Sequence, residues 1–331
     1  MGRGTTAKIG LRRPAPTLTG GLVLGLAMLA FGAVMIGPYG LTPGQTLVAL
    51  FGAGDAQAQI VVWNIRLPRV VAALVVGAAL AAAGASYQAL FRNPLVSPDI
   101  LGVSAGAGLG AVAGIFLSLP VAAIQASAFV GGMAAVGVVT LVASMVRNTD
   151  RTLTLVLIGV VIGALAGAAT SLLKVMADPY DQLPAITFWL LGSLAAITAE
   201  DILPALPMVL AGLVPLALLR WRINVLSLGD EEARALGVEA GRTRLLVIVA
   251  ATLITASVTA LAGVVGWVGL VIPHIARMLV GPGFGRLLPT SVLIGAGYLL
   301  IVDTLARTIA QAEVPLGILT AVIGAPFFVW L

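Results

Sequence analysis

No charged residue occurs between Ile100 and Val146, and this run constrains the fold more than any other feature of the chain. A helix crosses the hydrocarbon core of a bilayer with about 20 apolar residues, so the run is too long for one crossing and long enough for two. The rest of the chain is similar, since 60% of its 331 residues are hydrophobic and 9% are charged. Soluble domains carry about 25% charged residues. The sequence therefore predicts a protein whose main solvent is lipid.

Uncharged windows, divided at proline or glycine, predict an all-α polytopic membrane protein with ten transmembrane helices. The longest run is expected to turn at residues 118–120, and the seventh and eighth spans divide at 263–266. Residues 183–199 are interpreted either as a short helix at one surface or as another crossing. The predicted spans are approximately 18–36, 70–91, 100–119, 121–146, 152–173, 202–219, 245–264, 266–280, 287–306 and 314–331.

The basic residues predict the orientation of these spans. An even number of spans places both termini on one side, and 14 of the 18 lysines and arginines lie on that side. Because basic residues accumulate on the cytoplasmic side, we expect both termini in the cytoplasm and the chain in the cytoplasmic (inner) membrane. The run 18–36 also follows basic residues, as in a secretory leader. It is longer than a leader's apolar region and is interpreted as the first permanent span.

No hydrophilic stretch is long enough for a soluble domain, so residues 1–331 are predicted to form one transmembrane domain with a cytoplasmic loop at about 220–244. The chain has no cysteine, which excludes disulfides, thiolate metal sites and a cysteine nucleophile. Its one histidine, His274, cannot complete a metal site alone and is expected to hydrogen-bond to a neighbouring helix or loop. No metal site is therefore predicted.

One carboxylate, Asp303, lies near the outer end of the ninth predicted span. Arg307 follows four residues later, and an ion pair between the two would reduce the cost of either charge near lipid. A carrier driven by protons or sodium usually needs intramembrane carboxylates along its pathway. With one candidate of this kind, the chain is poorly equipped for ion-coupled transport.

Two short segments carry turn and packing signals. Residues 92–99 contain two prolines and end at Asp99, which predicts a rigid re-entry into the membrane, with an ordinary tight turn as the alternative.

The glycines that follow, at 102, 106 and 110, recur every four residues. On a helix they form a stripe where another backbone can approach closely, so we interpret them as packing positions and not as a nucleotide loop.

In the cytoplasmic loop, residues 227–237 are predicted to form a short helix. Its three acids lie at the start, where the helix dipole favours them, and Gly237 is suited to the left-handed conformation that ends a helix. Ala233, Ala235 and Leu236 are expected to give it an apolar side. Such a helix suits a docking knob for a soluble partner, and a solvated connection is the alternative.

Together these segments resemble the permease subunits of bacterial ABC importers for iron-siderophores, haem and cobalamin, the FecCD-type family. The resemblance extends over nearly the whole chain in the expected order, and it is uninformative about the ligand. The matching segments are 65–69, 92–110, 227–237, 266–277 and 324–328.

The resemblance implies ten transmembrane helices in a cobalamin-importer-type fold, with two permease subunits, expected to form a homodimer, around a central path. It also implies two ATP-binding subunits, a periplasmic or lipid-anchored binding protein, and surrounding lipid, with no nucleic acid partner. ATP and Mg belong to the partner ATPases, because this chain has no P-loop motif. We therefore expect no bound cofactor, no catalytic residue and no enzymatic activity in this chain.

The family also implies roles for individual residues. The predicted cytoplasmic gate comprises Asn93, Leu95 and Thr152. The residues expected to couple to the ATPase are Asp230, Glu231, Glu232, Ala233, Arg234, Leu236 and Gly237.

Three arginines on the outer side need a separate explanation. Arg66 and Arg69 lie at the outer entrance of the second predicted span, and Arg307 lies at the outer end of the ninth. The family docks its binding protein through acidic residues that meet such arginines, so Arg66, Arg69 and Arg307 are predicted docking residues. Interfacial snorkelling of their side chains is the alternative.

The implied function is alternating-access import driven by partner ATPases, with a ferric siderophore as the leading cargo and haem or cobalamin as further candidates. A permease for a molybdate-type oxyanion is the alternative. A secondary carrier, an intramembrane enzyme and a purely structural subunit are less well supported. The polar residues supply no positioned acid, base or nucleophile for an enzyme. A structural subunit would not need a docking knob, and the chain is poorly equipped for an ion-coupled carrier.

Overall fold

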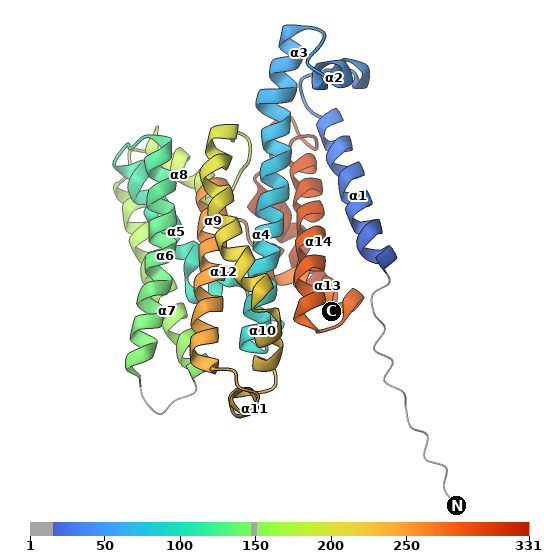
Figure 1. Cartoon of the computed structure of the whole chain (residues 1–331). Coiled ribbons are helices and arrows are strands. Elements are labelled where there is room, and N and C mark those ends of the chain that lie inside the picture. Colours follow the sequence, from blue (N-terminus) through green and yellow to red (C-terminus); the bar gives the residue numbers. More distant parts are fainter. Residues whose placement is uncertain (1–15, 147–150, 331) are drawn as a thin grey trace, which may run out of the picture.

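The computed structural model describes residues 16–146 and 151–330, and this part of the chain is a bundle of helices (Figure 1). Two of the short elements are not α-helical, since η1 is a π-helix and η2 is a 3₁₀-helix. The elements are α1 (Pro16–Met35), α2 (Pro43–Leu50), α3 (Ala56–Ile60), η1 (Val61–Arg66), α4 (Leu67–Phe91), η2 (Pro98–Leu101), α5 (Val103–Phe116), α6 (Val121–Met145), α7 (Arg151–Met176), α8 (Gln182–Leu191), α9 (Ala199–Leu218), α10 (Arg220–Leu226), α11 (Asp230–Ala235), α12 (Ala240–Ala262), α13 (Val268–Val280), α14 (Phe284–Ala306) and α15 (Leu316–Trp330).

Each of the ten predicted spans corresponds to a helix. Within the described residues, seven helices are long and apolar enough to cross a membrane, and one of these runs without interruption from Ala56 to Phe91. The third, eighth and tenth predicted spans are the shorter apolar helices α5, α13 and α15. The predicted turn between the third and fourth spans lies between α5 and α6, and the predicted surface helix is α8, at the outer end of the bundle.

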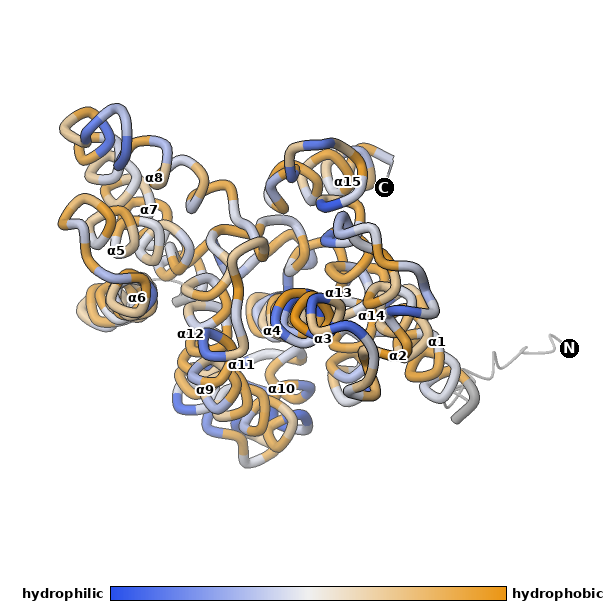
Figure 2. Tube along the Cα trace, turned by 90° about the horizontal axis from the view of Figure 1, so that it is seen from above, coloured by the Kyte–Doolittle hydropathy of each residue, from blue (hydrophilic) through white to orange (hydrophobic). Residues whose placement is uncertain are grey.

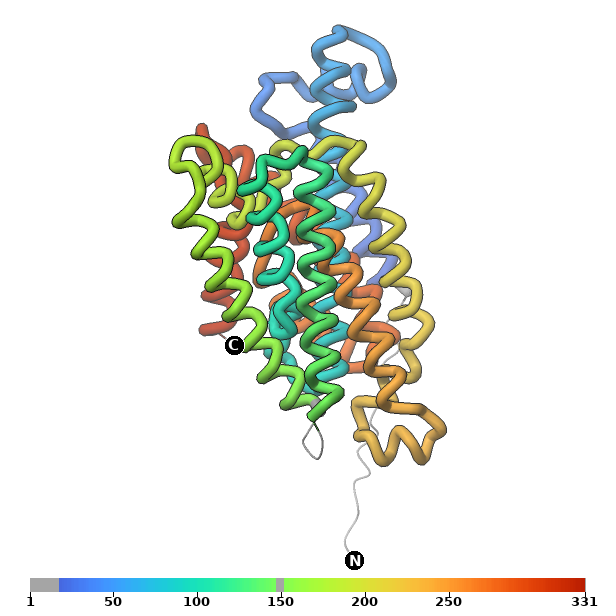
Figure 3. Tube along the Cα trace, turned by 90° about the vertical axis from the view of Figure 1, so that its left-hand side faces the viewer, coloured from blue at the N-terminus to red at the C-terminus, as the bar shows by residue number. Residues whose placement is uncertain are grey.

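We call the two ends of the bundle cytoplasmic and outer, following the orientation predicted from the basic residues. The cytoplasmic end carries α10 and α11, and the outer end carries α2 and α3 (Figures 1 and 3). α1 begins toward the cytoplasmic end, and α15 runs toward it. The arrangement therefore agrees with termini on one side of the membrane.

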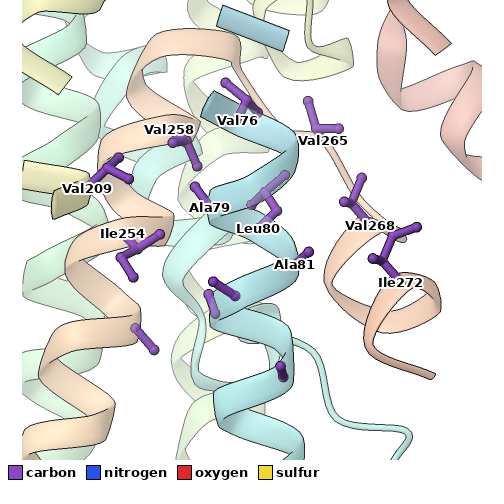
Figure 4. Packing of buried hydrophobic residues seen from close by; sticks show 14 of the residues in the cluster. Val76, Ala79, Leu80, Ala81, Val209, Ile254, Val258, Val265, Val268 and Ile272 are labelled. Atoms are coloured by element: carbon purple, nitrogen blue, oxygen red, sulfur yellow. The ribbon is translucent and has the colours of Figure 1, made fainter. Parts of the chain in front are cut away.

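Helix α4 is the centre of the bundle (Figure 2). It packs against α12, α13 and α14, and its buried surface consists largely of alanine, valine and glycine. Gly77 lies against the backbone of Gly295 on α14, and Gly84 against that of Gly269 on α13, so a Cβ atom at either glycine would collide with backbone. Small residues allow membrane helices to approach closely, which explains this composition. Figure 4 shows Val76, Ala79, Leu80 and Ala81 of α4 between Ile254 and Val258 of α12 on one side and Val268 and Ile272 of α13 on the other.

The glycine stripe of α5 has the predicted packing role. A Cβ atom at Gly106 would collide with the carbonyl of Gly131 on α6, and one at Gly110 with the carbonyl of Ser127. The first glycine of the stripe, Gly102, has a φ of 79° and lies near α7 instead.

Three non-helical segments meet toward the outer end of the bundle. They are residues 192–198, 263–267 and 307–315. The backbone N–H of Ser193 donates to Ala262, and that of Leu316 donates to Gly192, both at 2.9 Å. In a membrane protein irregular backbone must be satisfied inside the protein, and these bonds join the segments to one another.

Candidate functional site

The predicted coupling helix is present as α11, at the cytoplasmic extremity of the bundle. Gly237 has a φ of 76° and ends the turn after α11 as predicted, with its N–H donating to the carbonyl of Arg234 at 3.0 Å. The preceding helix α10 is fixed to the bundle by Asn224, whose Oδ1 accepts a 2.7 Å hydrogen bond from the backbone N–H of Phe284 at the start of α14. The segment is therefore a fastened knob and not a loose connection.

An ion pair joins the start of α11 to α12. Arg244 donates to both oxygens of Asp230, at 2.9 and 3.4 Å. The hydrogen bond and the charge of Arg244 hold the pKa of Asp230 below its ordinary value. Because Arg244 is buried and Asp230 is partly exposed, the pair anchors a surface helix to a membrane-spanning one.

The exposed surface of α11 differs from the predicted one. Ala233 is fully buried against the bundle, whereas Leu236 is 52% exposed, and Ala235 is exposed as well. The expectation of a shared apolar side was wrong, because the tight turn after α11 directs Leu236 outward. Glu231 and Arg234 are also exposed. The outward surface of the knob is thus mixed apolar and charged, with Asp230 and Ala233 turned to the protein.

The predicted gate residues lie near the cytoplasmic ends of α4 and α7. Asn93 Oδ1 accepts a 2.9 Å hydrogen bond from the backbone N–H of Leu95, which stiffens the turn, and the Leu95 side chain is 62% exposed. The following element, η2, packs on α7, where Gly159 lies against the carbonyl of Ile100. Thr152 lies on α7 two turns nearer the cytoplasm. The structure brings both parts of the predicted gate to one end of the bundle, and their gating role stays a prediction.

The outer end contains a buried charged cluster centred on Arg69. Its Nε donates to both oxygens of Asp303 on α14, at 2.9 and 3.1 Å. Its two terminal nitrogens donate to the carboxylate of Glu313, at 2.9 and 2.7 Å. Glu313 also accepts from Ser193 Oγ at 3.2 Å. One guanidinium group therefore ties α4 to α14 and to two of the three irregular segments.

The other two arginines of this region cap the carboxyl end of α1. Arg66 Nη1 donates to the carbonyls of Val34 and Met35, at 3.0 and 3.3 Å. Arg307 Nη2 donates to the carbonyl of Ala33 at 2.6 Å. The last carbonyls of a helix lack partners within it and carry the negative end of its dipole, which explains two buried cations at this position. The expected i,i+4 pair is present, with Arg307 Nε 3.7 Å from Asp303.

The three predicted docking arginines are therefore brought together but turned inward. Their exposed fractions are 1% for Arg66, 6% for Arg69 and 7% for Arg307. Docking of an external carboxylate by them stays a prediction, and it would require exchange of internal partners. The sequence reasoning missed Glu313, which stands in an outer loop before a proline with no motif around it.

The single histidine does not make the expected hydrogen bond. His274 Nδ1 is buried without a partner in the described part of the chain, and its ring meets the edge of Phe327 on α15 at 6.2 Å. The expectation was wrong because α15 presents an aromatic ring at this position and not a polar group.

The bundle, with apolar membrane-crossing helices and a fastened knob at one end, is that of a multi-pass transport permease of the inner membrane. The chain belongs to the FecCD transport family, which it matches over residues 24–331. It is 41% identical over 319 residues to the molybdate import system permease protein MolB of Haemophilus influenzae, covering 95% of this chain and 94% of that protein.

Two further similarities agree with this assignment. A probable iron chelatin transport system permease protein of Helicobacter pylori is 42% identical over 276 residues, covering 82% of each chain. A solved structure of a putative metal-chelate type ABC transporter in an inward-facing conformation is 40% identical, with a TM-score of 0.87, covering 95% of this chain and 97% of the solved one.

Proposed function

We propose that this chain is the membrane-spanning subunit of an ABC importer that carries a bulky metal chelate, with a ferric siderophore as the first candidate, into the cytoplasm by alternating access. Two copies of the chain would surround the path, two ATPases would bind the cytoplasmic end, and a binding protein would deliver the cargo outside. Haem and cobalamin are chelates of comparable bulk. Family membership and the similarity to a metal-chelate transporter support the class of cargo.

The observation that carries the proposal is the α10–α11 knob. It exposes Glu231, Arg234 and Leu236 while Asp230 and Asn224 fasten it to α12 and α14. A partner that pushes on such a knob moves the membrane helices with it. We propose that α11 is the helix that receives force from the ATPase and that Asn93, Leu95 and Thr152 belong to the gate that responds.

The buried carboxylate argues against an ion-coupled carrier. Asp303 has no exposed surface and is paired with both Arg69 and Arg307. A carboxylate with no exposed surface, engaged by two arginines, is not accessible to an ion or proton that would have to enter and leave. An oxyanion permease is the second candidate function, because the molybdate permease is similar over almost the full length of both chains.

The decisive experiment reconstitutes the chain with its ATPase and binding protein in vesicles. We expect uptake of the radiolabelled metal chelate that needs ATP, the ATPase and the binding protein together. Metal analysis and mass spectrometry of the isolated binding protein identify the cargo. Molybdate in that protein would select the oxyanion candidate, and uptake driven by an ion gradient without the ATPase would overturn the proposal.

A further inference from the structure

A long groove follows the outer half of the α1–α14 contact. It has a volume of about 490 Å³ and is lined mainly by apolar side chains of both helices, with two glycines from α1 and one threonine from α14. Below it the helices touch, since Gly297 of α14 lies 3.6 Å from Leu26 and 3.7 Å from Leu29, as measured to an ideal Cβ atom. Its lining residues are Gly25, Met28, Leu29, Gly32, Ala33 and Ile36 with Leu300, Ile301, Thr304 and Leu305.

The groove has the length of one bilayer leaflet. From Gly25 to the end of α1 at Met35 the helix rises about 15 Å, which equals half of a hydrocarbon core of about 30 Å. α1 is the peripheral helix here (Figures 1 and 2), and 11% of its residues from Leu18 to Met35 are buried. An apolar groove at this depth faces lipid and not water.

A polar hollow continues the groove at its outer end. It has a volume of about 420 Å³, and Ile36 lines both spaces. Arg307 and Glu313 supply one charge of each sign to its lining, and Gln311 adds an exposed amide. Arg307 Nη1 makes no hydrogen bond within residues 16–146 and 151–330, although Nη2 is occupied by Ala33. The hollow therefore offers, at the level of the headgroups, a cationic donor without a hydrogen bond and a carboxylate, Glu313, that also accepts from Arg69 and Ser193.

We propose that the groove and the hollow together bind one phospholipid of the outer leaflet whose headgroup carries a primary amine, as in phosphatidylethanolamine. An acyl chain fills the groove between α1 and α14. The phosphate accepts from Arg307 and Gln311, since a guanidinium group suits phosphate, and the ammonium group lies near Glu313. The lipid completes the packing of a helix that the protein itself covers poorly.

Glycine gives a matched test of the groove. An ideal Cβ atom at Gly25 or Gly32 meets nothing within 4 Å, so leucine at both positions fills the groove without an internal collision. Gly20 and Gly21 on the same helix are equally unobstructed and line neither space. The control variant is therefore Gly20→Leu with Gly21→Leu.

The assembled transporter is purified in mild detergent, and the lipid that remains bound is counted by mass spectrometry. We expect the parent and the control to retain phosphatidylethanolamine and the Gly25→Leu, Gly32→Leu variant to retain about tenfold less, which corresponds to about 1.4 kcal/mol of binding free energy. Assembly with the ATPase, measured by size exclusion, is expected to be the same for all three proteins. Equal retention by the groove variant, or no retained lipid in the parent, overturns the proposal.

The headgroup is tested by reconstitution in equal amounts of phosphatidylethanolamine, phosphatidylcholine and phosphatidylglycerol before detergent extraction. Phosphatidylcholine has the same phosphate but no N–H donor, and phosphatidylglycerol has no cation. We expect phosphatidylethanolamine to be enriched at least about threefold over each, or about 0.65 kcal/mol. Equal enrichment, or preference for phosphatidylglycerol, overturns the assignment of the amine to Glu313.

Discussion

Arg69 and Asp303 form a buried ion pair of 2.9 Å although 234 residues separate them in the sequence. Breaking such a pair from one side costs about 3–5 kcal/mol, because the remaining charge stays buried. We expect Asp303→Ala to lower the unfolding temperature strongly, since Arg69 and Arg307 both lose the buried carboxylate between them and keep Glu313 and the carbonyl of Ala33. Thermal unfolding of the detergent-purified protein, followed by tryptophan fluorescence, measures the effect. Asp181→Ala is the control, because this exposed carboxylate accepts no capping hydrogen bond, and equal stability of the two variants would refute the structural role.

The docking prediction has a sharper form now that the internal partners are known. Glu313 accepts from the two terminal nitrogens of Arg69, which an external carboxylate would need as donors. We expect Glu313→Gln to increase the affinity for the binding protein and Arg69→Glu to decrease it, each by about tenfold, or about 1.4 kcal/mol. Binding to the transporter in nanodiscs at low and high salt measures both, and parent docking should weaken as salt rises.

Basal ATPase activity of the assembled complex should stay near the parent value in both variants, because the cytoplasmic knob is unchanged. If Arg66, Arg69 and Arg307 can all be changed to Glu without a change in binding-protein affinity, the docking prediction is wrong. Capping of α1, bridging to α14 and, for Arg307, the proposed contact with a lipid phosphate would then account for these residues.

The coupling prediction centres on the exposed residues of the knob. Glu231→Arg combined with Leu236→Asp should abolish most ATP-driven transport or detach the ATPase, since both residues face away from the bundle. Membrane insertion and thermal stability are expected to change by no more than about 0.5 kcal/mol, as for other surface substitutions. Asp55→Arg, on the outer side, is the control. Normal transport by a correctly assembled double variant would contradict the assignment of α11.

The pH dependence of the Asp230–Arg244 pair has a defined sign. The folded state holds the pKa of Asp230 below its ordinary value, so the pair contributes stability above the unfolded pKa of about 3.9 and loses it as the pH falls through the lower folded value. We therefore expect the difference in unfolding temperature between the parent and Asp230→Asn to be constant from about pH 7 to pH 5 and to shrink below about pH 4. A difference that grows in acid would show that the pair is not the cause.

The absence of cysteine makes the topology directly measurable. Single cysteines at Ala53 and Tyr180, both exposed at the outer end, should react with an impermeant maleimide in intact cells. A cysteine at Leu228, which is 60% exposed near the knob, should react only after the membrane is opened. Labelling of the cysteine at position 228 in intact cells would show that the predicted orientation is wrong. Thr149, a further predicted cytoplasmic position, lies outside the described residues.

The spans were predictable because lipid imposes one strong rule, namely about 20 uncharged residues per crossing helix. The glycine stripe was predictable for a similar reason, since spacing on one helix decides which face can approach a neighbour. The outer end of the long helix formed by α3, η1 and α4 was not predictable. Arg66 and Arg69 ended the predicted span near residue 70, whereas the helix runs on outward to Ala56. Its arginines are neutralised by Asp303, Glu313 and the carbonyls of α1, and those partners are distant in the sequence.

The candidate site was predictable only where its residues lie close to one another in the sequence. The acids and the terminal glycine of α11 lie within eight residues of one another, and capping rules relate them. The burial of Ala233 and the exposure of Leu236 depend on how α11 rests on α10 and α12, which no local pattern contains. The same limit applies to His274, whose neighbour Phe327 comes from another helix.

The helix from Ala56 to Phe91 has a mechanical consequence. Its 36 residues extend about 54 Å, so it projects well beyond the about 30 Å thickness of the hydrocarbon core. Arg66 and Arg69 hold this rod near the outer surface, and the turn containing Asn93 and Leu95 begins at its opposite end. About 22–25 residues, or about 33–37 Å, separate the held point from the far end, so a tilt of about 5° would displace that end by roughly 3 Å. If the helix tilted as one body about the arginine cluster, a small displacement at the outer surface would therefore reach the cytoplasmic turn as a movement of side-chain size.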